Sequence, residues 1–264
     1  LLFIIKASVS GGTSVLSLSL LPRNFTWVSY EAVFKYRDIW IGYQNSLVLA
    51  FVGTFLSLAV TVCCAYPLSR ADFKGGGVVM LLCMITMYFS GGLIPTYLVV
   101  RELYLTNTLW SLILPGVMSV YNMIVMRTYF KSQIPPEMLE SAQLDGCNNI
   151  RYLLSIVLPL SGSILAVIGL FYAVGYWNSY FSAMIYITDR NGYPLSLVLR
   201  ELLVLSRETD LTGMVSLDDS MSLEARRNLM KYAVIVVSSL PVMLLYPLIQ
   251  KYFVKGVMVG AVKG

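Results

Sequence analysis

Residues 140–160, ESAQLDGCNNIRYLLSIVLPL, form a polar stretch with a glycine in it, between two hydrophobic segments of the chain. Just before this stretch, Pro135 and Pro136 suit the first turn of a helix, where a backbone N–H has no partner in any case. Gly146 suits the left-handed residue that follows a helix end. The pattern therefore predicts a short helix over residues 137–145.

This short helix needs support, because two turns of helix are marginal in water and must be held by packing. Asn148 or Asn149 can cap a second helix that leads into the next hydrophobic segment. Two interpretations of the stretch are open: a linker packed on its own bundle, or a contact surface for another protein. The apolar or small residues and the polar residues of the short helix fall on different sides: Met138, Leu139 and Ala142 on one, and Glu137, Glu140 and Ser141 on another.

The composition is that of an integral membrane protein. Hydrophobic residues make up 57% of the 264 residues, charged residues only 12%, and the mean hydropathy is +0.73. A soluble domain has roughly 25% charged residues. A bilayer core of about 30 Å needs about 20 apolar residues per helix, and several runs of the chain are that long. We therefore expect an all-α membrane protein, built as one transmembrane domain over residues 1–264.

Five spans are predicted, with a loop over residues 127–152 between the third and the fourth. Gly91, Gly92 and Pro95 interrupt the second span, and Pro159 is expected to separate a short leading helix from the rest of the fourth. The opening residues LLFII resemble the tail of a further span, so we expect six spans with the first largely missing from this chain. The five cover residues 40–68, 78–100, 108–126, 153–187 and 229–249.

The distribution of Lys and Arg predicts the orientation. The side with residues 70–74, the 127–152 loop and the C-terminus has eight basic and four acidic residues, whereas the other side has eleven and ten over nearly twice the length. Cytoplasmic loops carry the denser positive charge. The 127–152 loop is therefore predicted to be cytoplasmic, and the loop over residues 188–228 to face outward.

Several function classes are disfavoured by what the sequence lacks. It has no histidine and no Gly-Lys pair, so histidine-based catalysis and a phosphate-binding loop of its own are absent. The four cysteines lack metal-ligand spacing, so we expect no catalytic residue, bound metal or cofactor on this chain. The scattered basic residues argue against nucleic acid as a partner. An ion-coupled carrier and a membrane-embedded enzyme remain alternatives, although the span cores contain no ionisable residue to serve either.

Candidates for a substrate path lie in or near the spans. Tyr172, Tyr176 and Tyr180 follow one another at i, i+4 spacing, which would place them on one helix face. Aromatic faces beside amides suit a sugar, but the same residue types also pack helices and gather at the membrane interface. The remaining candidates are Asn45, Asn122, Trp177 and Asn178.

The short helix and the segment after it carry a longer pattern: Glu140-Ser141-Ala142, three residues, Gly146, nine residues, then Ile156-Val157-Leu158-Pro159. This resembles the permease signature of ATP-binding-cassette importers, E-A-A, three residues, G, nine residues, I-x-L-P. Only Ser141 departs from it, and serine is nearly as small as alanine. The segments YPLSRADFKG, IPPEMLESAQLDG and YFVKGVMVGAVKG resemble the carbohydrate-uptake, maltose-permease-like branch. YPLSLVLREL, residues 193–202, resembles permeases for polysaccharides and complex oligosaccharides.

The resemblance implies a six-helix type I importer permease that forms the pathway for a carbohydrate, or alternatively for another solute. It implies a second permease subunit, two ATPase subunits that hold the ATP and Mg²⁺, and an extracytoplasmic solute-binding protein received by the outward loop. The assembly would lie among the lipids of a bacterial cytoplasmic (inner) membrane. The residues expected to couple the chain to the ATPase are Glu137, Glu140, Ser141, Ala142, Asp145, Gly146 and Pro159.

Overall fold

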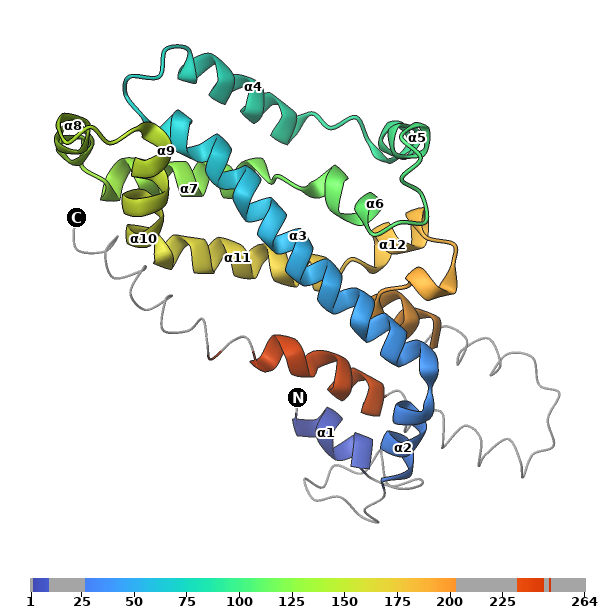
Figure 1. Ribbon diagram of the computed structural model, residues 1–264. Helices are drawn as coiled ribbons and strands as arrows, with labels where there is room; N and C mark the ends of the chain where they lie inside the picture. Colours follow the sequence, from blue (N-terminus) through green and yellow to red (C-terminus); the bar gives the residue numbers. More distant parts are fainter. Residues whose placement is uncertain (1, 10–26, 203–231, 245–246, 248–264) are drawn as a thin grey trace, which may run out of the picture. The chain divides into compact units, whose positions relative to one another are not determined.

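The computed structural model describes residues 2–9, 27–202, 232–244 and 247, and these residues form helices, turns and loops without a strand (Figure 1). The predicted all-α class is therefore confirmed for the described residues. The chain divides into two compact units. Unit 1 comprises Leu1–Val48 and Trp177–Leu245, and unit 2 comprises Leu49–Tyr176 and Tyr246–Gly264. That residues 1–264 act as one transmembrane domain stays a prediction.

Helix α3 (Arg37–Ser69) is the longest helix and contributes residues to both units. Its 33 residues give a length of about 50 Å, more than the roughly 30 Å of a bilayer core. By length and composition it is the one helix among the described residues that can cross a membrane by itself. If each of two bent helix pairs is counted as one span, these residues offer three spans. The span predicted over residues 40–68 lies within α3.

The second predicted span, residues 78–100, is two helices rather than one. Helix α4 (Gly76–Tyr88) and helix α5 (Leu93–Glu102) are bent by 109° at the break between them. Gly92 has a φ of +83°, a backbone conformation that residues with a side chain rarely adopt. The predicted interruption is confirmed, and the pair forms either a broken span or a re-entrant loop.

The third predicted span, residues 108–126, is wrong as a continuous helix. Helix α6 (Trp110–Ile113) and a 3₁₀ turn, η2 (Leu114–Gly116), precede helix α7 (Val120–Gln133). Helix α7 continues past Arg127, where the sequence suggested an end. The Arg127 Nε donates a 2.7 Å hydrogen bond to the carbonyl of Leu68 at the end of α3, so its charge is accommodated where the two helices meet.

The fourth predicted span, residues 153–187, is also divided. Helix α9 (Asn149–Tyr152), the π-helix η3 (Leu153–Val157) and helix α10 (Leu158–Leu160) precede helix α11 (Gly162–Trp177), and helix α12 (Tyr180–Tyr186) follows. A bend of 84° separates residues 149–160 from α11, two residues beyond Pro159. The predicted break near this proline is confirmed. A single helix through Tyr180 is wrong, because α11 ends at Trp177.

The π-helix fits its place before a proline. The Leu158 N–H donates to the Leu153 carbonyl, five residues back, which is the hydrogen bond of a wide turn. In an ordinary α-helix the ring of Pro159 would collide with the carbonyl of Ser155, four residues earlier. The wider turn offers a way to relieve that collision.

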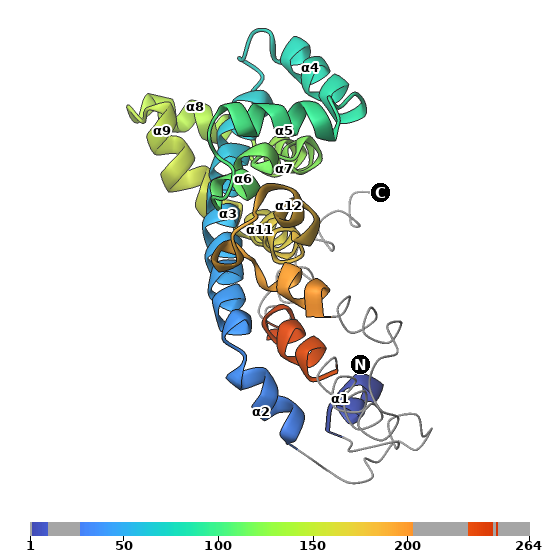
Figure 2. The same cartoon turned by 90° about the vertical axis from the view of Figure 1, so that its right-hand side faces the viewer.

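Close packing of α3 against α11 forms the core of unit 2, and Figures 1 and 2 show the two helices crossing. The Tyr176 hydroxyl forms a 2.8 Å hydrogen bond with Ser57 Oγ, and its ring covers Gly53 so closely that a Cβ there would lie 2.7 Å from the nearest ring carbon. One turn earlier, the Tyr172 hydroxyl is 2.8 Å from Thr61 Oγ1 and accepts from the N–H of Ser119. These polar contacts fix the register between the helices.

Unit 1 holds helix α1 (Leu2–Val9), helix α2 (Val28–Lys35), the first turns of α3, helix α12 and the 3₁₀ turn η4 (Arg190–Gly192). It also holds a helix that begins at residue 195 and an apolar helix, Tyr232–Leu244. The helix Tyr232–Leu244 lies in the span predicted over residues 229–249, whose ends lie outside the described residues. The predicted outward loop, residues 188–228, is described as far as residue 202.

We predict that Gly53→Ala destabilises the protein, because the added methyl group must displace the Tyr176 ring, and overpacking of this kind costs about 1–3 kcal/mol. Gly175→Ala is the matched control, since a Cβ at this helical glycine meets no atom within 4 Å. Thermal unfolding in detergent should show a lower Tm for the first variant and an unchanged or slightly higher Tm for the second. Equal Tm values for both would contradict the packing described.

Candidate functional site

Helix α8 (Pro136–Leu144) is the short helix predicted from the opening stretch, shifted by one residue. Its end has the predicted glycine cap. The Gly146 N–H donates to the Gln143 carbonyl at 3.0 Å and the Cys147 N–H to the Ala142 carbonyl at 2.9 Å, with Gly146 at φ +74°. These two bonds and the left-handed glycine make a Schellman motif. The cap sets the direction in which the chain leaves α8.

One side of α8 is buried against its own unit and the other is open. Ala142 is only 7% exposed, which explains why a small residue stands there, whereas Leu144 is 90% exposed. The Ser141 hydroxyl donates to the carbonyl of Glu137 at 2.9 Å, so it is used within the helix. This is why serine can replace alanine in the signature. The exposed acidic residues around Leu144 are Glu137, Glu140 and Asp145.

Two asparagines after α8 have separate tasks. The Asn148 side chain accepts a 2.8 Å hydrogen bond from the N–H of Arg151 and so caps α9, which confirms one of the two predicted caps. The Asn149 side chain instead accepts a 2.6 Å hydrogen bond from the guanidinium of Arg70. The start of α9 is therefore attached to the loop that follows α3.

Arg70 has further partners on its own side. Its Nε donates to Asp72 Oδ1 at 2.8 Å, a second nitrogen donates to the Tyr66 hydroxyl at 3.2 Å, and the guanidinium carbon lies 5.8 Å from the centre of the Tyr66 ring. The bond from Arg70 lowers the pKa of Asp72, and the same bond raises the pKa of Arg70. The guanidinium thus stays charged and is held by four groups.

Sequence reasoning missed this cluster, since it used Arg70 only to mark the end of a span. The spacing Arg70-x-Asp72 directly after an apolar run was the signal available. A further attachment comes from α7, where the Tyr129 hydroxyl lies 2.9 Å from Ser163 Oγ at the start of α11. Together with the Arg127 bond to α3, these contacts attach α8 and α9 closely to the helices of unit 2.

The predicted substrate-path residues of unit 2 are buried. Tyr172 and Tyr176 are each 7% exposed with hydroxyls bonded as described, and Asn122, in the first turn of α7, is also 7% exposed. The predicted stripe of three tyrosines on one helix face is wrong, because Tyr180 begins α12 and belongs to the other unit. Asn178, in the connection before it, is exposed. A role for any of them in a substrate path stays a prediction.

In unit 1, Asn45 and Trp177 make hydrogen bonds within the chain. Asn45 Nδ2 donates to the carbonyls of Asn191 and Tyr193 at 2.8 and 3.0 Å. Trp177 Nε1 donates to the Ser238 carbonyl at 3.3 Å. Their place in a substrate path also stays a prediction, but their amide and indole groups position other segments of unit 1.

Asn45 is part of a surface on α3 that receives the YPLSLVLREL segment. Ser46 Oγ accepts a 2.8 Å hydrogen bond from the N–H of Leu195, the first residue of its helix, and a Cβ at Gly42 would lie 3.1 Å from the Leu195 Cα. The small residues Gly42 and Ser46, four apart, were the signal in the sequence for this close approach. The segment is therefore held firmly on the first turns of α3.

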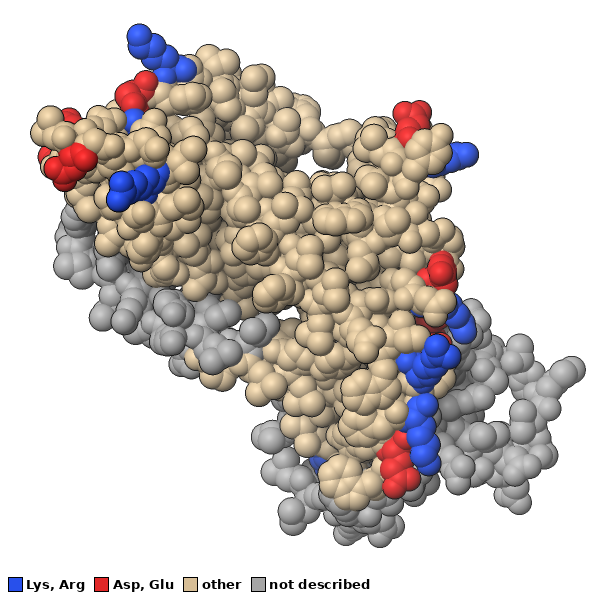
Figure 3. Space-filling view, in the orientation of Figure 1, with Lys and Arg blue, Asp and Glu red and all other residues tan. Residues whose placement is uncertain are grey.

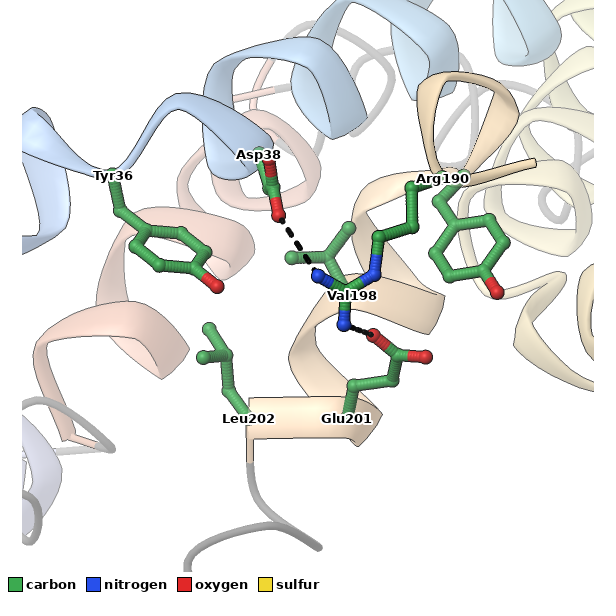
Figure 4. A pocket seen from close by; sticks show the side chains of 7 residues that line it. Tyr36, Asp38, Arg190, Val198, Glu201 and Leu202 are labelled. Atoms are coloured by element: carbon green, nitrogen blue, oxygen red, sulfur yellow. Dashed lines mark ion pairs between the residues drawn. The ribbon is translucent and has the colours of Figure 1, made fainter. Parts of the chain in front are cut away.

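Figure 4 shows a pocket at the edge of this surface, where Arg190 reaches between two carboxylates. Its guanidinium lies 4.0 Å from Asp38 on α3 and 3.6 Å from Glu201 on the helix that begins at residue 195. All three side chains are at least one-third exposed, so these ion pairs contribute little stability. Among the described residues, no group of three or more acidic or cysteine side chains is placed so that it could hold a metal ion.

Two of three comparisons with known proteins found similar ones. No family model matches it. It is 40% identical over 248 residues to protein LplC of Bacillus subtilis, covering 94% of this chain and 82% of that protein. It is also 40% identical over 245 residues to the polygalacturonan/rhamnogalacturonan transport system permease protein YtcP of the same species, covering 93% and 84%.

A solved structure is similar over nearly the whole chain. The crystal structure of a bacterial ABC transporter involved in the import of the acidic polysaccharide alginate contains a chain that is 31% identical to this one. The TM-score is 0.84, with 96% of this chain and 89% of that chain covered. The similarity in fold thus accompanies a clear similarity in sequence.

We predict that Arg70→Gln loosens the start of α9, because the bonds from the guanidinium to Asn149 and Asp72 are lost. Hydrogen exchange of a peptide covering residues 148–152 should become faster by about tenfold, which corresponds to one charged hydrogen bond of about 1.5 kcal/mol. Lys74→Gln removes the same charge from an exposed residue of the same loop and should leave that exchange unchanged. Similar exchange in the two variants would be evidence against the attachment.

Proposed function

Since the chain belongs to the carbohydrate-uptake branch of the permease subunits of ATP-binding-cassette importers, we propose that it carries an oligosaccharide or polysaccharide across a bacterial cytoplasmic membrane. The family and the importer-permease fold that the signature implied are confirmed by the relatives and by the similar structure. Two of these proteins carry polysaccharide names, polygalacturonan/rhamnogalacturonan and alginate, and this supports a polymer or its fragments as substrate. A permease for another solute is the alternative.

The observation that carries the proposal is helix α8, capped at its end, exposed along one side and attached to unit 2 on the other. We assign it as the element that docks on a separate ATPase subunit. Leu144 offers exposed apolar area, and Glu137, Glu140 and Asp145 offer carboxylates to basic residues of that partner. Burying such an apolar residue within a ring of polar contacts is typical of strong protein interfaces.

The distribution of charge supports a membrane-crossing role for unit 2. On the face seen in Figure 3, its charged side chains gather over the α8–α9 region and over the end of α5, and the surface between them is uncharged. The sequence agrees, since residues 49–69, 75–100, 103–126 and 152–176 hold no Asp, Glu, Lys or Arg. With the denser positive charge inside, α8 would face the cytoplasm and could reach an ATPase there.

The proposed assembly contains a second permease subunit and two ATPase subunits, and the ATP and Mg²⁺ bind to the ATPase subunits. Movement of the ATPase would act on α8 and pass through Asn149 and Arg70 to the end of α3. From α9 it would also pass through the π-helix to α11, which packs on α3 through Tyr172 and Tyr176. The segment that Asn45 and Ser46 hold is our candidate surface for an extracytoplasmic binding protein.

The experiment that tests this function is uptake into proteoliposomes that contain the chain with its permease and ATPase partners, with binding protein and labelled oligosaccharides supplied outside. Uptake should require ATP inside and should persist when ionophores remove every ion gradient. Uptake that survives without ATP but stops with the ionophores would instead identify an ion-coupled carrier.

We predict that Leu144→Asp reduces ATP-driven uptake at least tenfold, because it places a charge in the centre of the proposed contact with the ATPase. The side chain is 90% exposed, so the Tm of the permease should be unchanged. Ser132→Asp adds the same charge at an exposed position on α7 and serves as the control. Normal uptake with Leu144→Asp would refute the assignment of α8 as the docking helix.

A further inference from the structure

A cleft opens directly beside α8, next to its exposed side. Its volume is about 390 Å³, which lies in the range of pockets that bind drug-sized ligands. Leu139, Glu140 and Gln143 of α8 form one wall. The end of α3 with the loop after it, the last turns of α7, the end of α9 and the π-helix η3 form the others, and all of these elements belong to unit 2.

Tyr152 lines this cleft, and its hydroxyl lacks a hydrogen-bond partner among the described residues. The residue is only 3% exposed. Leaving a buried hydroxyl unpaired costs about 1–3 kcal/mol, so such groups are rare unless something else satisfies them. Because Tyr152 lines the cleft, a polar group that enters it from outside this chain can supply the missing partner once the covered hydroxyl is opened to it.

The charges around the cleft favour a protein side chain over an anionic lipid headgroup. Arg70 and Lys131 are balanced by Asp72 and Glu140, and Arg70 is already engaged with Asp72. A site for a phosphate would instead present an excess of basic over acidic residues. The wall between these charges is mostly apolar, which suits the aliphatic or aromatic body of a side chain.

We infer that the cleft receives a side chain of the ATPase subunit, one with a long apolar body and a hydrogen-bonding tip that pairs with the Tyr152 hydroxyl. This inference rests on the proposed function, because it continues the contact of α8 with that subunit. The two surfaces would then interlock: α8 docks on the ATPase, and a side chain of the ATPase fills the cleft beside α8. Such a contact resists both pushing and pulling, whereas an exposed face alone transmits mainly a push.

The first test is crosslinking in the assembled transporter. A photoactivatable benzophenone is attached at Lys131→Cys, which lines the cleft on α7, in a chain whose four native cysteines are replaced. Ser132→Cys is the control, since this neighbouring residue is exposed but does not line the cleft. Label at residue 131 should crosslink to the ATPase subunit at least tenfold more than label at residue 132.

The outcomes separate this inference from the proposed function. The inference is overturned if label at residue 131 crosslinks only to lipid or a small molecule. It is also overturned if label at residue 132 crosslinks to the ATPase equally well. Leu144→Cys with the same label is the reference for α8. If residue 144 crosslinks to the ATPase and residue 131 does not, the inference falls and the proposed function stands. Loss of crosslinking from both residues 131 and 144 would overturn the two together.

The second test uses Tyr152→Phe, which removes only the hydroxyl. The affinity of the purified ATPase for the permease pair should fall about five- to tenfold, as expected for the loss of one buried hydrogen bond. The Tm of the permease pair without ATPase should be unchanged or higher, because an unpaired buried hydroxyl has been removed. An unchanged affinity would overturn the inference.

Discussion

Arg70 provides the constraint on which the rest of unit 2 depends. Its guanidinium joins the ring and hydroxyl of Tyr66 near the end of α3, the carboxylate of Asp72 in the next loop and the side chain of Asn149 at the start of α9. A nine-residue helix such as α8 does not persist alone in water, so its place must be set by what holds its two ends. Gly146 turns the chain at one of those ends, and Arg70 secures the segment that follows.

Holding α9 in this way gives α8 a route to the helices that cross the membrane. One branch leads through Arg70 into α3, and another leads through the π-helix and the 84° bend into α11. The branches meet again where Tyr172 and Tyr176 bond across to α3. Because the protein interior is close-packed, a displacement of α8 is transmitted through these contacts rather than absorbed by them.

The sequence predicted the local features of this site well and the long-range ones poorly. The bounds of α8, its glycine cap and the Asn148 cap depend on neighbouring residues, so their pattern is visible in the chain itself. That α7 continues as a helix past Arg127 was not predicted, and the guanidinium of Arg127 bonds to a carbonyl 59 residues away. Asn45 was considered only for substrate or interhelical bonding because its partners, Asn191 and Tyr193, lie nearly 150 residues on. Nothing in the local pattern identifies such partners.

The claim that α8 moves together with the end of α3 can be measured by the distance between two spin labels. One is placed on the native Cys147, just after α8, in a chain whose other three cysteines are replaced, and the other on Lys74→Cys in the loop after α3. The distance distribution is recorded in the assembled transporter with and without ATP. The account predicts the same distribution in both states, and a shift of several ångströms between them would contradict it.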